Sequence, residues 1–128
     1  MSLDVRDLLA PCAPDGASLP LAPDVVFHSP VADYSGRDDV AHLLPKLGQC
    51  LTGIEPEQEF TEDGGRHSVT TFHGNVRDES VYGAFVQEVD EQGRLREATL
   101  LLRPLNTLRT AVSIMREALA ADPLPSSR

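Results

Sequence analysis

Three turn signals that separate four extended segments constrain the fold of this chain more than any other feature. Gly, Asn and Asp gather at EDGG (62–65), GNVRDE (74–79) and DEQGR (90–94), and such runs favour tight turns. The segments around them are rich in β-branched and apolar residues, which is typical of strands. Because short turns join neighbouring strands in the antiparallel sense, the pattern predicts a meander. Its four strands are expected at about 54–62, 66–75, 79–90 and 94–104.

Two apolar stripes with spacings of three and four flank the extended segments. The first stripe comprises Val40, Leu43, Leu44, Leu47 and Leu51, and the second Leu105, Leu108, Val112, Met115 and Leu119. Such spacing places each set on one face of a helix, and the second helix is expected at about 106–121. Helices that pack against one face of a curved antiparallel sheet give an α+β fold. Pro45 removes one helical hydrogen bond, so we expect a kink or split in the first helix.

The N-terminal part carries several prolines and has room only for a short helix, with Val5, Leu8 and Leu9 on one face. A strand is expected at 24–30, ended by Pro30. A length of 128 residues suits one domain. We therefore expect a single domain over 1–128, with its core at about 20–121.

Composition and charge exclude several classes of protein. The net charge is −9 and the isoelectric point about 4.7, so the chain repels phosphate backbones and nucleic acid is not expected as a partner. No apolar run reaches the roughly 20 residues that span a bilayer, and no secretory signal is evident. We expect a cytoplasmic protein without a membrane partner, whose Cys12 and Cys50 are unpaired thiols.

The histidines do not form a recognisable site in the sequence. His67 and His73 share a strand face but lie about 20 Å apart at roughly 3.3 Å per residue, and His28 has no second metal ligand at a recognisable spacing. We therefore expect no metal and no cofactor. His28 and Ser29 are adjacent in a strand and point to opposite faces, which argues against a catalytic pair.

The order helix, strand, helix and four long strands resembles the NTF2-like superfamily, and within it the SnoaL-like and ketosteroid-isomerase-like proteins. The resemblance rests on LAPDVVFHSPV (21–31), YSGRDDVAHLL (34–44) and VDEQGRLREATLLLRPL (89–105). It implies a cone, in which a curved antiparallel sheet, the meander plus a short first strand, wraps around helices and a pocket. It also implies a homodimer through the outer sheet face. The family usually has about two helices before the first strand, so the lid of the pocket is expected to be shortened or supplied by another chain.

The acid–base groups of these relatives are replaced in this chain. The position that matches the general base of ketosteroid isomerases is Ser29, the donor carboxyl matches Phe85, and a donor tyrosine matches Leu44. The histidine and aspartate of the SnoaL-type cyclases match Ala98 and Leu100. Catalytic residues therefore stay unassigned, because a neutral hydroxyl is a poor base.

Alternation along the strands predicts which side chains face the pocket. The predicted lining is Phe27, Ser29, Leu44, Leu47, Ser68, Thr70, Phe72, Phe85, Gln87, Arg96, Ala98, Leu100 and Leu102. This largely apolar set favours binding of a small apolar molecule. The alternative is an isomerase, cyclase or lyase that acts on a polyketide- or steroid-like carbonyl compound, with Ser29, Gln87 and Arg96 polarising the carbonyl. A filled interior is a further alternative.

The same alternation places a mixed apolar and charged set on the outer face of the sheet. It includes Tyr82, Val86, Thr99, Leu101 and Arg103, and these residues are expected to form the homodimer interface. A subunit that uses this face to bind another protein is a third possible function, alongside ligand binding and catalysis.

Overall fold

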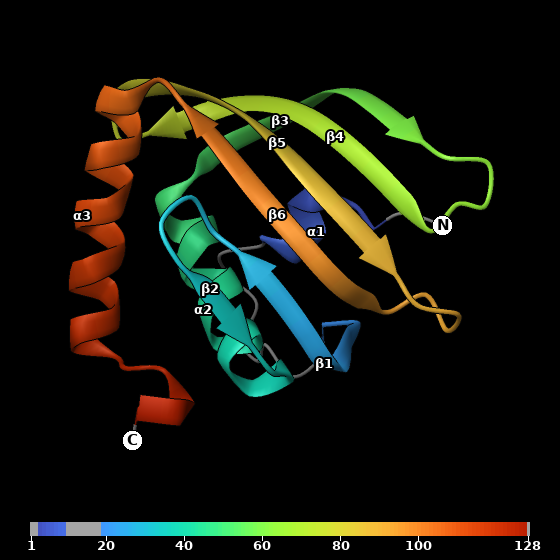
Figure 1. Cartoon of the computed structure of the whole chain (residues 1–128). Helices are drawn as coiled ribbons and strands as arrows, with labels where there is room; N and C mark the ends of the chain where they lie inside the picture. Colours follow the sequence, from blue (N-terminus) through green and yellow to red (C-terminus); the bar gives the residue numbers. More distant parts are fainter. Residues whose placement is uncertain (1–2, 10–18, 128) are drawn as a thin grey trace.

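A curved six-stranded sheet forms the body of the protein, as seen in a computed structural model that describes residues 3–9 and 19–127 (Figure 1). The strands are β1 (Leu21–His28), β2 (Asp33–Ser35), β3 (Thr52–Thr61), β4 (His67–Val76), β5 (Glu79–Val89) and β6 (Leu95–Arg103), in the order β2-β1-β6-β5-β4-β3. The predicted meander is confirmed, because β3, β4, β5 and β6 pair antiparallel in sequence order. The α+β fold class predicted from the sequence is also confirmed.

Two features of the sheet were not predicted. The sheet is not wholly antiparallel, because β1 pairs with β6 in the parallel sense. A short edge strand, β2, pairs antiparallel with β1. Its three residues are too few to show an alternating pattern in the sequence.

The described helices are α1 (Val5–Leu8), α2 (Arg37–Cys50) and α3 (Leu105–Ala121), followed by the short 3-10 helix η2 (Pro125–Ser127). In Figure 1, α2 lies behind β1 and β2, and α3 runs alongside the sheet from the end of β6. The helix α2 is continuous through Pro45, so the helix is not split, and the alternative of a kink stays a prediction. Apolar side chains on both sides of Pro45, such as Val40 and Leu47, are buried. This packing holds the helix together despite the lost hydrogen bond.

The core lies between the inner face of the sheet, α2 and α1. The side chains of Val5, Leu8 and Leu9 are at most 2% exposed, so the core extends to residues before the expected limit of about 20. The side-chain amide of Gln87 on β5 accepts a hydrogen bond from the Leu3 N–H and donates one to the Leu3 carbonyl, both at 2.8 Å. The N-terminal segment of this chain therefore covers this part of the sheet, and whether another chain contributes to the lid stays a prediction.

Two further expectations concern the cysteine thiols and membrane-spanning helices. Cys50 is a buried free cysteine, and burial raises the pKa of its thiol, while Cys12 lies outside the described residues. None of the helices formed by residues 3–9 and 19–127 combines the length and apolar character needed to cross a membrane.

Candidate functional site

Most side chains that were predicted to line the pocket fill the interior of the sheet instead. Phe27, Leu44, Phe72, Phe85, Ala98 and Leu100 all face inward and are at most 1% exposed. The rings of Phe27 and Phe85 lie against each other, with centroids 6.5 Å apart. Close packing of this kind leaves no room for a ligand at the centre of the sheet.

The predicted polar residues of the interior are also buried. Ser68, Thr70 and Gln87 are at most 4% exposed, and Ser68 lies directly opposite Gln87 across β4 and β5. The side-chain amide of Gln87 is hydrogen-bonded to the backbone of Leu3, as described above. The Ser68 hydroxyl is buried without a hydrogen-bond partner in the part of the chain that the structure describes.

The expectation that Arg96 faces the interior is wrong. The register between β5 and β6 shifts at this point, because Glu88 pairs with Glu97 while Val89 pairs with Leu95. Arg96 is the extra residue of this β-bulge, which changes the alternation of side chains. Its guanidinium lies 3.7 Å from the Glu88 carboxylate and the side chain is 51% exposed.

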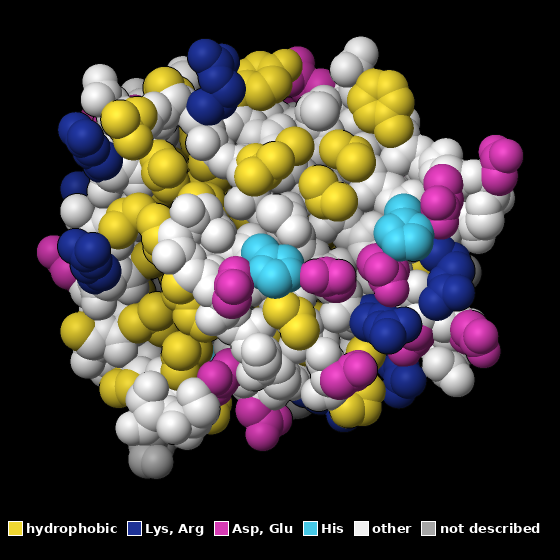
Figure 2. Space-filling model, viewed as in Figure 1, with side chains coloured by type: hydrophobic (Ala, Val, Ile, Leu, Met, Phe, Trp, Pro, Cys, Tyr) yellow, Lys and Arg dark blue, Asp and Glu magenta, His cyan; other side chains and the backbone are white. Residues whose placement is uncertain are grey.

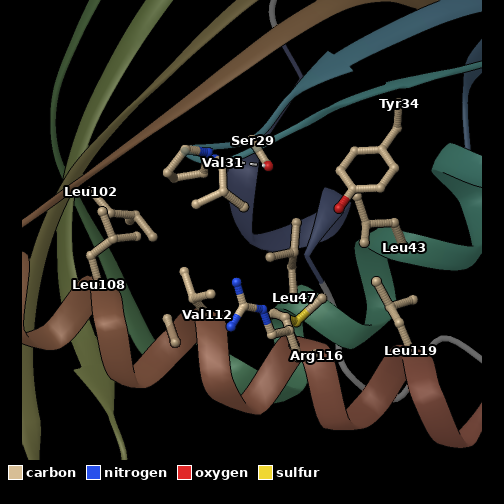
Figure 3. Close-up of a pocket in the computed structure, with 13 residues that line it drawn as sticks. Ser29, Val31, Tyr34, Leu43, Leu47, Leu102, Leu108, Val112, Arg116 and Leu119 are labelled. Atoms are coloured by element: carbon tan, nitrogen blue, oxygen red, sulfur yellow. Dashed lines mark hydrogen bonds between the residues drawn. The ribbon is translucent and has the colours of Figure 1, made fainter.

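A pocket of about 280 Å³ opens instead between α2, α3 and the loop that joins β1 to β2 (Figure 3). Of the residues predicted from the sequence, Ser29, Leu47 and Leu102 line it. The other lining residues are Pro30, Val31, Tyr34, Leu43, Leu108, Ala111, Val112, Met115, Arg116 and Leu119. The lining is therefore mainly aliphatic, with a serine, a tyrosine and an arginine as its polar members.

Ser29 shapes the loop at the rim of this pocket. Its hydroxyl donates to the Ala32 carbonyl at 2.8 Å and accepts from the Ala32 N–H at 3.0 Å. The Val31 N–H also points to this hydroxyl, at 3.3 Å. These bonds within the loop occupy the hydroxyl, so the structure gives Ser29 a local role in forming the turn after β1.

Tyr34 comes from β2 and reaches the pocket from the side opposite α3. Its ring lies 6.5 Å from that of Phe27, and its hydroxyl points into the space between α2, α3 and the loop (Figure 3). Sequence analysis missed Tyr34 because it lies on the short strand that the pattern did not reveal.

The apolar stripe of α3 was interpreted as a core contact. Its Met115 and Leu119 do pack against the core, and Leu108, Val112, Met115 and Leu119 also line the pocket. Only Thr107 and Ala111 of α3 are buried, whereas Leu108, Val112 and Met115 are partly exposed toward the pocket. A stripe at helical spacing looks the same in sequence whether it faces a packed core or a cavity. Arg116 follows Val112 by four residues and therefore shares this face of α3. That spacing is visible in the sequence and could have placed Arg116 among the lining residues.

The side chains proposed to polarise a carbonyl are not brought together. Ser29 lies at the pocket rim, Gln87 is buried and bonded to Leu3, and Arg96 lies on the solvent side of the sheet. That residue set therefore does not form a catalytic site.

Comparison with solved structures places this architecture among known folds. An uncharacterised bacterial protein with a cystatin-like fold from Silicibacter pomeroyi DSS-3 is 25% identical, with a TM-score of 0.76 over 80% of this chain and 73% of that chain. A steroid delta-isomerase from Pseudomonas aeruginosa is 26% identical, with a TM-score of 0.76 over 80% of this chain and 76% of that one. An NTF2-like protein of unknown function from Cytophaga hutchinsonii ATCC 33406 is 12% identical, with a TM-score of 0.54 over 70% of this chain and 74% of that one.

The chain has an NTF2-like fold. This confirms the resemblance drawn from the sequence at the level of the fold. No protein-family model matches the chain, and no curated protein matches it in sequence. The fold is shared by proteins of several functions, so the function of this NTF2-like chain has to be argued from its site.

The outer face of the NTF2-like sheet carries histidines that lie beside carboxylates (Figure 2). His28 is held between Asp33 on β2 and Glu97 on β6, each at 2.7 Å from a ring nitrogen, so it points away from the pocket. Hydrogen bonds with Asp33 and with Glu97 raise the pKa of His28.

His67 at the start of β4 has a similar environment. It contacts the carboxylates of Glu62 and of Glu88, the second of which also faces Arg96. Hydrogen bonds with Glu62 and with Glu88 raise the pKa of His67. No three His, Cys, Asp or Glu side chains within residues 3–9 and 19–127 are arranged to hold a metal ion.

These histidines predict how stability depends on pH. A histidine whose pKa is higher in the folded chain stabilises it fully below the unfolded pKa of about 6.5, and this stabilisation is lost as pH rises through the folded pKa. We expect the double variant His28→Gln/His67→Gln to lose less thermal stability than the parent when the pH is raised from about 6 to about 8.5. Circular dichroism melts at both pH values measure this difference.

Salt provides the control for the pH experiment. Both histidines are partly exposed to solvent, so their interactions with carboxylates are screened by salt. We expect the difference between parent and double variant to shrink at about 1 M NaCl, where screening extends to about 3 Å. Equal pH dependence of the two proteins at low salt contradicts the prediction.

Proposed function

We propose that this chain binds a small, mainly apolar molecule in the pocket between α2, α3 and the β1–β2 loop. The observation that carries the proposal is that most of the apolar stripe of α3 borders an open cavity, although Met115 and Leu119 also pack against the core. The pocket volume of about 280 Å³ lies just below the range of typical ligand sites, about 300–1,000 Å³. Aliphatic walls from two helices and one loop favour a compact hydrophobic ligand.

Methionine methyl groups provide a direct test of where a ligand binds. The chain has two methionines, and one of them, Met115, lines the pocket. A protein labelled with ¹³C at the methionine methyl groups is titrated with steroids, aromatic polyketides and terpenoids. We expect at least one class of probe to shift the Met115 signal in a saturable way.

A substitution that fills the pocket makes the test specific. We expect Val112→Trp to weaken binding of the selected probe by at least tenfold, because the larger side chain occupies the cavity. Ser113→Trp is the matched control, since Ser113 is the next residue of α3 and is exposed. Calorimetric titration measures both affinities, and circular dichroism checks that the variants are folded. Equal affinity of Val112→Trp and the parent contradicts this location of the site.

A second candidate function is isomerisation of a carbonyl compound. It is favoured by the 26% identity to a steroid delta-isomerase and by the Tyr34 hydroxyl, a donor that points into the pocket. Against it, none of the described residues that line the pocket is a carboxylate or a histidine, and proton transfer needs a base. Ultraviolet absorbance of a conjugated enone formed from a β,γ-unsaturated ketosteroid tests this activity. Turnover that is lost in Tyr34→Phe supports it.

Neither proposal requires a cofactor, nucleic acid or a membrane as a partner. These expectations, together with the cytoplasmic location, stay predictions from the sequence.

A further inference from the structure

Arg116 is the one charged side chain among the described residues that line the pocket. The chain has 20 acidic and 11 basic residues, yet none of the described residues that line this cavity is acidic. Figure 3 shows the guanidinium rising from α3 into the space between Val112 and Leu47. The local charge of the pocket is therefore opposite to that of the chain as a whole.

Three other arginines of this chain are paired with acids. Arg6 lies 3.0 Å from Asp4, and Arg94 lies 2.8 Å from Asp90. Arg96 faces Glu88, as described above. By contrast, no ion pair or hydrogen bond joins Arg116 to another side chain within the part of the chain that the structure describes. In a strongly acidic protein, an arginine without an acidic partner at the edge of an apolar cavity is a group available for binding an anion.

The remaining polar groups of the pocket are consistent with an acceptor on the ligand. The Ser29 hydroxyl is occupied by its own loop, which leaves the Tyr34 hydroxyl and the Arg116 guanidinium. An arginine side chain only donates hydrogen bonds, and a tyrosine hydroxyl can donate one as well. Both groups therefore suit oxygen atoms that carry negative charge or lone pairs.

We propose that the ligand of this pocket is an apolar molecule with a carboxylate group, which Arg116 binds while the apolar body lies against α2 and α3. This inference rests on the proposed function, since it specifies the class of ligand for the same pocket. The planar guanidinium matches the two oxygens of a carboxylate. Arg116 is exposed to solvent, so the contribution is that of a screened, partly hydrated pair.

Isosteric acid and amide pairs test the charge of the ligand. The probes are 2-naphthoate against 2-naphthamide and octanoate against octanamide, titrated at low salt and followed by the methyl signal of Met115. We expect each carboxylate to bind the parent protein about fivefold more tightly than its amide, equivalent to about 1 kcal/mol. This preference is expected to disappear in Arg116→Gln.

Arg109→Gln is the matched control, because Arg109 lies seven residues earlier on α3, is exposed, and does not line the pocket. We expect it to keep the preference for carboxylates. Equal binding of acids and amides by the parent overturns the proposed ligand class but leaves the pocket function in place. A preference that persists in Arg116→Gln, or one that Arg109→Gln removes equally, overturns the role of Arg116. Failure of all four probes to bind at millimolar concentration counts against both the ligand class and the pocket function.

Discussion

Replacing Phe85 with alanine is expected to lower the free energy of unfolding by about 3–5 kcal/mol. Phe85 is fully buried, and it lies between Thr70 of β4 and Leu100 of β6 in the sheet. Its ring also packs against Phe27. Truncation removes apolar burial and leaves a cavity that the surrounding strands cannot close. Urea denaturation followed by circular dichroism measures the change.

Phe60→Ala is the control for this prediction. Phe60 lies on β3 and is 58% exposed, so the same truncation is expected to change stability by less than about 0.5 kcal/mol. Comparison of Phe85→Ala with Phe60→Ala also tests whether the inner face of the sheet borders an open ligand space. If the inner face around Phe85 bordered an open ligand space, Phe85→Ala would create no new cavity and would cost no more than about 1–2 kcal/mol. Such a small effect would contradict the filled interior.

The part of the fold that sequence analysis predicted depends on short-range signals. Turns at EDGG, GNVRDE and DEQGR fix which strands are neighbours, because each hairpin is local in the chain. The parallel pairing of β1 with β6 joins Phe27 to Ala98, and no local pattern encodes a contact over that separation. The edge strand β2 could not be predicted from the sequence pattern either, because its pairing with β1 depends on the loop shaped by Ser29.

The candidate site was harder to predict than the fold. Alternation correctly placed Phe72 and Gln87 on the inner face, but alternation does not state whether an inner face is filled or hollow. One β-bulge was enough to move Arg96 to the outer side, and bulges have no reliable signature in a single sequence. The pocket lies where α3 packs against α2. These helices are far apart in the chain, so no local sequence pattern shows that Arg116 borders a cavity.

The outer face of the sheet offers the second prediction with a large effect. We propose that this face forms a homodimer, as the resemblance implies. Apolar side chains gather on it (Figure 2), with Leu101 53% and Tyr82 45% exposed. Val86 pairs with Thr99 across β5 and β6 in the same region, and Tyr82 pairs with Arg103. Exposed apolar side chains in a contiguous patch are typical of an interface.

Leu101→Asp is expected to convert the dimer to a monomer. In an interface with two-fold symmetry each chain contributes the same patch, so one substitution introduces two carboxylates. Burying an unpaired charge costs several kcal/mol, and 1.4 kcal/mol already weakens association tenfold. Size-exclusion chromatography with light scattering is expected to report twice the chain mass of 13.9 kDa for the parent and one chain for the variant.

Leu105→Asp separates an effect at the interface from a general effect of added charge. Leu105 is 58% exposed and begins α3, outside the patch around Leu101, so this variant is expected to stay dimeric. A parent protein that elutes as a monomer refutes the dimer, and a dimeric Leu101→Asp variant refutes this choice of face. Because the pocket opens between α2 and α3 on another part of the molecule, the monomeric variant is expected to keep its ligand affinity. The proposed dimerisation and the proposed ligand binding are therefore expected to be separable, so that each can be measured in the absence of the other.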